Sequence, residues 1–201
     1  MRKLTIGLTL ALVAVAGYMT AMARRQNPRP FVPLTVTYRV TDYDDRGNAT
    51  PVGTETRVRS ASGAWHETKE MADGTRREIF SEPGRGVFGV QDGRMIRLSD
   101  AATAPDERTH EQRRAEHDYT RDDNIAGYPV AVFKTTSPDG KASSEFYSAP
   151  SLGGMVLKMV IREPGLTRVR EAISVERGEP AAALLAHPEL PVKDWKLQDK
   201  R

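Results

Sequence analysis

Residues 155–175 show the fold most clearly; they read MVLKMVIREPGLTRVREAISV. Apolar side chains fall on one face of the run before Pro164-Gly165 and on one face of the run after it. These side chains are Leu157, Met159 and Ile161 in the first run and Val169, Ile173 and Val175 in the second. Because successive side chains of a strand point to opposite faces, the pattern predicts two β-strands joined by a tight turn.

The same strand-turn-strand pattern recurs along the chain. Asp73-Gly74, Asp92-Gly93 and Asp139-Gly140 each separate two β-prone runs, and Asp-Gly is a strong hairpin signal because both central residues of a type I′ turn need positive φ. The runs predicted as strands are Thr35–Thr41, Thr54–Ser60, Trp65–Met71, Thr75–Ser81, Gly86–Gln91, Arg94–Ser99, Ala131–Ser137, Lys141–Ser148, Met155–Arg162 and Thr167–Val175.

These runs predict a mainly β fold of about eight to ten strands. The connections are too short for parallel crossovers, so the sheet should be antiparallel. Most strands are apolar on one face and polar or charged on the other, which suits a sheet curled over its own core with one side in water. One or two short helices are expected, and Pro180–Ala186 is the best candidate because proline stands in its first turn.

The N-terminus predicts export from the cytoplasm. Arg2 and Lys3 precede an apolar run, and Ala21-Met22-Ala23 offers a small-residue cleavage site, which together make a secretory signal peptide of residues 1–23. An uncleaved anchor is the alternative, because residues 4–23 are long enough to span a bilayer; they are the only membrane contact predicted. Residues 24–33 read as a proline-rich leader and 34–201 as one β-rich domain. The predicted location is the periplasm or the extracellular space.

Composition excludes several classes of function. The chain holds no cysteine, so disulfides, thiolate zinc sites and lipoprotein acylation are ruled out. The net charge of +3 owes two units to Arg2 and Lys3, so the domain itself is nearly neutral. Such a charge gives no counterion-release drive toward nucleic acid, and we expect no nucleic-acid partner.

No catalytic set, cofactor motif or metal site is predicted. The segment 106–123 holds most of the clustered charges and lacks hydrophobic periodicity, and it reads as a solvated loop, a surface helix or a flap. His110 and His117 lie in it, but their spacing does not bring both onto one ion from a helix. Trp65 could line a ligand pocket or plug the core. The protein is therefore not expected to be an enzyme.

The C-terminal third resembles a group of exported bacterial β proteins. It reads Gly127-Tyr128-Pro129-Val130, then Glu145-Phe146-Tyr147-Ser148-Ala149-Pro150, and closes on Gly178-Glu179-Pro180 before an alanine-leucine run. Over residues 125–190 this order resembles uncharacterised proteins with the half-barrel architecture of the outer-membrane lipoprotein carrier (LolA-like).

The resemblance implies a curled sheet whose concave side is apolar and holds a lipid or another apolar ligand. It then implies that the inward face includes Leu157, Met159, Ile161, Val169 and Ile173, although a packed core would explain the same residues. A structural or protein-interaction module of the cell envelope, with an envelope protein as partner, is the alternative function.

Overall fold

The computed structural model describes residues 31–82, 86–91, 94–99, 118–186 and 192–194. These residues form a mainly β fold built on one sheet. Its strands are β1 (Leu34–Tyr43), β2 (Ala49–Arg59), β3 (Trp65–Met71), β4 (Arg76–Glu82), β5 (Gly86–Gln91), β6 (Arg94–Ser99), β7 (Asp118–Ile125), β8 (Tyr128–Thr136), β9 (Ser143–Ala149), β10 (Met155–Glu163), β11 (Leu166–Arg177) and β12 (Val192–Asp194). The helical elements of the described chain are the 3-10 turn η1 (Pro150–Leu152) and α3 (Ala182–Leu185).

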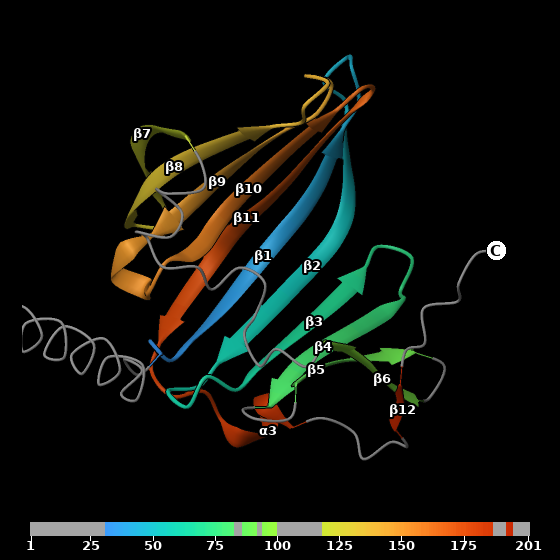
Figure 1. Ribbon diagram of the computed structural model, residues 1–201, viewed down its shortest axis with the longest axis vertical. Helices are drawn as coiled ribbons and strands as arrows, with labels where there is room; N and C mark the ends of the chain where they lie inside the picture. The colour runs from blue at the N-terminus through green and yellow to red at the C-terminus, as the bar shows by residue number, and fades with distance from the viewer. Residues whose placement is uncertain (1–30, 83–85, 92–93, 100–117, 187–191, 195–201) are drawn as a thin grey trace, which may run out of the picture. The chain divides into compact units, whose positions relative to one another are not determined.

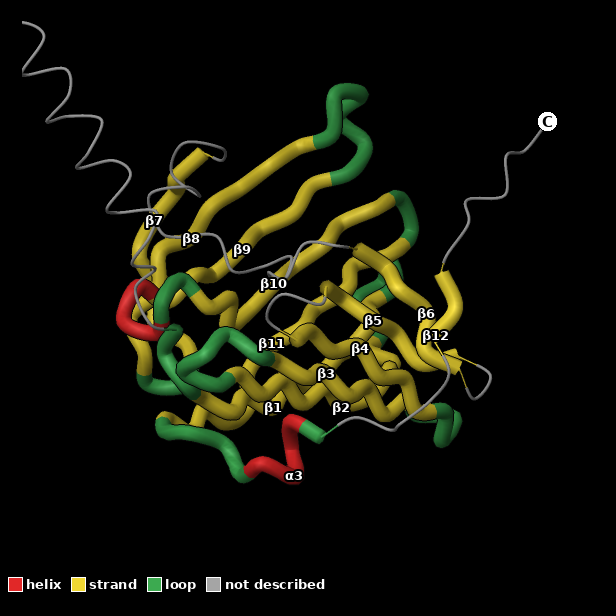
Figure 2. The backbone as a smooth tube through the Cα atoms, turned by 60° about the horizontal axis from the view of Figure 1, so that its bottom comes forward, coloured by secondary structure: helices red, strands yellow, loops and turns green. Residues whose placement is uncertain are grey.

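The strands follow the order β12-β6-β5-β4-β3-β2-β1-β11-β10-β9-β8-β7, and the sheet does not close on itself (Figure 1). Every pairing is antiparallel except that of β12, which runs parallel to β6. Figure 2 looks along the curl: β1 and β2 lie at the bottom of the curve, and α3 lies outside it. None of the described helices has the length and hydrophobicity of a membrane span.

The predicted fold class, an antiparallel curled sheet with little helix, is confirmed. Three strands, β3, β5 and β6, have the predicted bounds, and α3 falls inside the predicted helix 180–186. The sheet has more strands than the eight to ten expected, because β7 and β12 were not recognised. Residues 118–123, interpreted as part of a loop or surface helix, belong to β7; residues 106–117, with both predicted histidines, lie outside the described residues.

Apolar clusters occupy both sides of the sheet. The largest is built from β1, the end of β7 and β8–β11 with η1, and includes Leu34, Val36, Tyr38, Leu152 and Leu157. Two smaller clusters near β5 lie on opposite sides of the sheet: Trp65 packs with Val87, whereas Phe80 stacks on Phe88. Val87 and Phe88 are successive residues of β5, so their side chains point to opposite faces. The expectation of one side in water is therefore wrong for β4–β6.

The compact unit begins at Phe31, inside the segment that the sequence predicts as leader. Arg59 is fully buried and its Nε donates to the carbonyl oxygen of Val32 at 3.1 Å. The same guanidinium lies over the ring of Phe31, and Gly178 N donates to the carbonyl oxygen of Pro33. These contacts tie residues 31–33 to β2 and to the end of β11. Residues 1–30, which hold the predicted signal or anchor, lie outside the described part of the chain.

Candidate functional site

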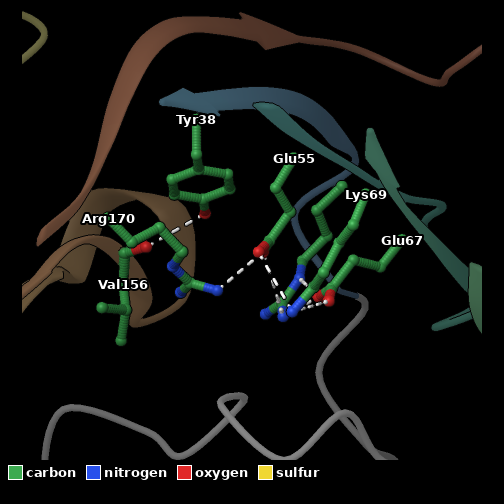
Figure 3. A network of polar contacts seen from close by, with 7 residues as sticks. Tyr38, Glu55, Glu67, Lys69, Val156 and Arg170 are labelled. Atoms are coloured by element: carbon green, nitrogen blue, oxygen red, sulfur yellow. Dashed lines mark hydrogen bonds and ion pairs between the residues drawn. The ribbon is translucent and has the colours of Figure 1, made fainter. Parts of the chain in front are cut away.

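Five charged side chains form a continuous row across β2, β3 and β11, which we call the charge ladder (Figure 3). Its members are Glu55, Arg57, Glu67, Lys69 and Arg170. Four of them are buried, and Glu55 is only 2% exposed. Lys69 is the exception, with 39% of its side chain exposed. Burial of this many charges is unusual, because each must be paired to offset its lost hydration.

The register of the sheet places the ladder on one side. Glu55 is the Cα partner of both Tyr38 and Lys69, Arg57 is the partner of Glu67, and Arg170 is the partner of Val40, which shares a face of β1 with Tyr38. Directly paired residues of antiparallel strands project to the same side. His66, between Trp65 and Glu67 on β3, points the other way and contacts α3. Because α3 lies outside the curve, the ladder lies on the concave side.

Each carboxylate of the ladder contacts at least two cations. Glu55 Oε1 accepts from Arg170 Nη1 at 2.7 Å, and its Oε2 lies 3.3 Å from Lys69 Nζ. Glu67 Oε2 accepts from Arg57 Nε at 2.9 Å and also contacts Arg57 Nη2, while its Oε1 lies 3.0 Å from Lys69 Nζ. Lys69 therefore bridges the two carboxylates, and the ladder joins β11 to β3 across β1 and β2.

Tyr38 packs against the charge ladder at its β11 end. Its ring lies under the Arg170 guanidinium, 4.5 Å from ring centroid to guanidinium carbon, a cation–π distance. Its hydroxyl donates to the carbonyl oxygen of Val156 on β10 at 3.0 Å. Tyr38 is fully buried, so the aromatic ring and the ladder form one packed unit with an apolar and a charged part.

The electrostatics of the ladder favour fixed charges over proton transfer. Burial raises the pKa of Glu67, but the charges of Arg57 and Lys69 outweigh it and hold that pKa below the usual 4.5. Burial lowers the pKa of Lys69, but Glu67 and Glu55 outweigh it and raise the pKa above 10.5. At neutral pH Glu67 stays ionised and Lys69 stays protonated. Neither group is poised as a general acid, a general base or an amine nucleophile.

Trp65 adds a hydrogen-bond donor beside the ladder. It is 3% exposed, shares a side of β3 with Glu67, and packs with Val87 and Ile79. The Arg57 guanidinium lies 5.9 Å from the centroid of its ring system. Its Nε1 is buried and has no hydrogen-bond partner in the described structure. Buried polar groups are nearly always hydrogen-bonded, so this N–H needs an explanation.

The five residues proposed from sequence as ligand-binding do not share one face. Met159 is the Cα partner of Arg170, whereas Val169 is the partner of Val160, so Met159 and Val169 point to opposite sides. Ile161 points to the side of Met159. Leu157 is fully buried in the main cluster, and Ile173 is 52% exposed.

Two register shifts in the strand pairing explain why simple alternation of side chains did not place these five residues correctly. The pairing of β10 with β9 shifts between Val156 and Lys158, which leaves Leu157 without a partner on β9. The pairing of β1 with β11 shifts between Thr37 and Tyr38, which leaves Ile173 without a partner on β1. An extra residue at a bulge changes the face on which following residues project. A ligand role for these residues stays a prediction.

The ladder itself was missed by sequence reasoning. The alternation of Glu55 and Arg57 with threonines was visible, but a charged face is normally the solvent face of a strand. The compensating charges come from β3 and from Arg170, which is 115 residues away from Glu55. Among the described residues, no group of three histidine or carboxylate side chains is placed to hold a metal ion.

Comparison with known proteins gives similarity in fold only. No family model matches the sequence, and no curated protein matches it. Similar solved structures include a chain of the Pseudomonas aeruginosa MucA/MucB complex, at 19% identity and a TM-score of 0.48 over 83% of this chain and 59% of that one. A crystal structure of MucB matches at 17% identity and a TM-score of 0.48, over 87% of this chain and 64% of that one. The chain thus spans less than two thirds of both.

A LolA superfamily protein from Nitrosomonas europaea is also similar, at 11% identity and a TM-score of 0.45 over 80% of this chain and 91% of that one. It belongs to the architecture that residues 125–190 resemble. Structural similarity at these TM-scores and identities does not show that this chain binds the ligands or partners of those proteins.

Proposed function

We propose that this protein is a non-enzymatic binding protein of the cell envelope, which holds an amphipathic ligand in the curve of its sheet. The apolar part of the ligand, an acyl chain, lies along the concave side near Met159 and Ile161. Its polar headgroup lies beside Trp65 and the charge ladder. A purely apolar ligand suits this side less well, because it would leave the charges of the ladder against hydrocarbon.

The observation that carries the proposal is the indole N–H of Trp65. It is a buried donor with no acceptor in the described structure, and leaving such a group unpaired costs about 1–3 kcal/mol. A headgroup oxygen, from a carboxylate, an ester or a phosphate, would supply the acceptor.

The test is binding of an acyl probe to the purified protein. Oleic acid and 1-oleoyl-lysophosphatidylglycerol are titrated in turn, and binding is followed by displacement of a fluorescent fatty acid and by tryptophan emission. We expect saturable binding of at least one of them, with a change in emission from Trp65. Absence of saturable binding by both probes would refute the proposal.

A ladder-side variant and a variant at an exposed position locate the site. Met159→Asp, on the ladder side, should weaken binding about tenfold or more, because it places a charge against the acyl chain. Ile173→Asp, at the exposed bulge of the neighbouring strand, is the matched control and should bind as the natural protein does. Thermal unfolding of both variants separates lost binding from lost folding.

A second candidate, a protein-interaction module of the envelope, is supported by β7. It is the terminal strand of the described sheet, all its side chains except that of Ile125 are exposed, and Tyr119 is 44% exposed. Asp118, Asp122 and Asp123 give it an acidic character that suits a basic partner. A photo-crosslinker at Tyr119 should give a discrete adduct in cells, and the same group at exposed Thr136 should not. Equal labelling from both positions would count against it.

A further inference from the structure

Lys69 is the member of the charge ladder that a ligand in the curve of the sheet can reach. Its side chain is 39% exposed, whereas those of Glu55 and Glu67 are 2% and 5% exposed. The side chains of the two ladder arginines are also covered, at 6% and 7%. The accessible part of this row of charges is therefore an ammonium group, and its carboxylates are covered.

The ammonium group of Lys69 is held in place and still has a hydrogen to donate. Its Nζ lies 3.3 Å from Glu55 Oε2 and 3.0 Å from Glu67 Oε1 (Figure 3). An ammonium carries three hydrogens, and these two oxygens are the acceptors that the described residues offer it. Because two buried carboxylates already fix the position of Nζ, little side-chain freedom is lost when a ligand oxygen takes the third hydrogen.

The charges around Lys69 indicate which kind of oxygen that is. Each neighbouring carboxylate is shared with a guanidinium: Glu55 contacts Arg170, and Glu67 contacts Arg57. The five groups together carry three positive and two negative charges, so the carboxylates do not cancel the charge of the ammonium. Lys69 stays protonated at neutral pH, since its pKa is raised. A hydrogen bond from it to an anionic oxygen is stronger than one to a neutral oxygen.

We infer that the headgroup of the ligand is anionic and contacts Lys69 Nζ. The inference rests on the proposed function and narrows it, because a fatty acid or a phosphate-bearing lysolipid fits the curve and a neutral acylglycerol fits it poorly. A carboxylate and a phosphate both present the anionic oxygen that the ammonium recognises. A cationic headgroup is repelled by the same exposed ammonium.

The experiment compares four headgroups on one acyl chain. Oleic acid and 1-oleoyl-lysophosphatidylglycerol are anionic, 1-oleoylglycerol is neutral and oleylamine is cationic. Each is offered to the purified protein by equilibrium dialysis below its micelle-forming concentration, at about pH 8, where carboxyl groups are ionised and amines protonated. We expect at least one anionic lipid to bind about tenfold or more tightly than the neutral and cationic lipids. The ranking of the two anionic lipids shows whether the source is a carboxylate or a phosphate.

Substitutions at Lys69 test whether this residue makes the contact. Lys69→Gln should weaken binding of the anionic lipid about tenfold or more and leave binding of 1-oleoylglycerol unchanged. Lys69→Arg keeps the positive charge and should keep most of the preference. Lys158→Gln is the matched control: Lys158 Nζ also pairs with a carboxylate, at 2.9 Å from Glu171 Oε2, but projects to the side of β10 opposite Met159. It should bind all four lipids as the natural protein does.

Two outcomes would overturn the inference and leave the proposed function standing. One is saturable binding of 1-oleoylglycerol as tight as that of both anionic lipids. The other is an anionic preference that a folded Lys69→Gln variant keeps in full, which would place the headgroup elsewhere. If that variant does not fold in a thermal unfolding test, the four-lipid comparison and Lys69→Arg still decide. Absence of saturable binding by all four lipids would instead refute the proposed function, and the inference with it.

Discussion

Arg170 Nη1 lies 2.7 Å from Glu55 Oε1, and this buried pair connects β11 to β2 across the intervening strand β1. The two residues are 115 positions apart in the chain. The pair therefore links the N-terminal strand β2 to the C-terminal strand β11 beside Tyr38. The rest of the charge ladder extends from Glu55 toward β3. The ladder lies on the concave side of these strands.

Glu55→Gln should destabilise the fold strongly. It keeps the shape of the side chain but leaves the buried cations of Arg170 and Arg57 without this carboxylate, and breaking a buried pair typically costs about 3–5 kcal/mol. Asp42→Asn is the control, because Asp42 pairs with Arg168 in an exposed position, where loss of a pair costs about 1 kcal/mol or less. Urea unfolding of both variants measures the difference. Equal losses would mean that burial of the ladder contributes nothing.

Stability should fall in acid because of Glu67. Its folded pKa lies below the ordinary value of 4.5, since Arg57 and Lys69 outweigh the effect of burial. The unfolded chain therefore takes up the proton first, so the stabilisation is complete above about pH 5 and disappears as pH falls through the folded pKa. Urea midpoints measured from pH 7 to about pH 3 should show this loss. The Glu67→Gln variant should have a lower urea midpoint at neutral pH, and its midpoint should fall less as the solution is made acidic.

Most of the fold could be predicted from the sequence, because hairpins are local. The pair Asp139-Gly140 fixes a turn and the alternation on either side fixes two strands, and neither depends on distant residues. β7 was not recognised, since its sequence DYTRDDNI has no apolar alternation: all its side chains but Ile125 are exposed. β12 has only three residues, too few for any period to show.

The candidate site could not be predicted, because its physics is non-local. A charge at Glu55 reads as solvent-exposed until Lys69 and Arg170 are known to lie beside it. The bulges at Leu157 and Ile173 are equally invisible, since one unpaired residue leaves no mark in composition. The role of Trp65 was left open between pocket and core, and its buried, unpartnered Nε1 is a property of its surroundings alone.

Gly63 should resist substitution more than Gly47. Both have positive φ, +88° and +81°, so alanine at either position carries a backbone cost of about 1–2 kcal/mol. A Cβ at Gly63 would also overlap the Phe31 ring, whereas nothing lies within 4 Å of one at Gly47. Gly63→Ala should therefore lose about 1 kcal/mol more than Gly47→Ala. A similar loss of unfolding free energy in both variants would show that the Phe31 ring moves aside without cost.

Leu157 and Ile173, two residues of the set predicted from sequence, should behave differently on truncation. Leu157→Ala removes a fully buried side chain and should cost about 2–5 kcal/mol in unfolding free energy. Ile173→Ala removes an exposed side chain and should change it by about 0.5 kcal/mol or less. Chemical denaturation measures both. A large loss for Ile173→Ala would mean that its bulge is packed in solution.

Trp65→Phe separates a ligand role from a structural one. Phenylalanine keeps most of the packing against Val87 and Ile79 but removes the buried N–H, which has no acceptor in the described structure. Loss of an unsatisfied donor relieves a desolvation cost, and this offsets part of the lost ring area, so the unfolding free energy should change by about 1 kcal/mol or less.

The same variant should bind the acyl probe about tenfold less tightly, because a hydrogen bond to a charged group contributes roughly 1.5–3 kcal/mol. Trp65→Leu is the comparison: it also removes the N–H but loses ring packing, so it should weaken binding similarly and lower stability further. Both variants are measured by displacement of the fluorescent fatty acid and by urea unfolding. If Trp65→Phe binds the probe as the natural protein does, the indole N–H contacts no headgroup and the proposed orientation of the ligand is wrong.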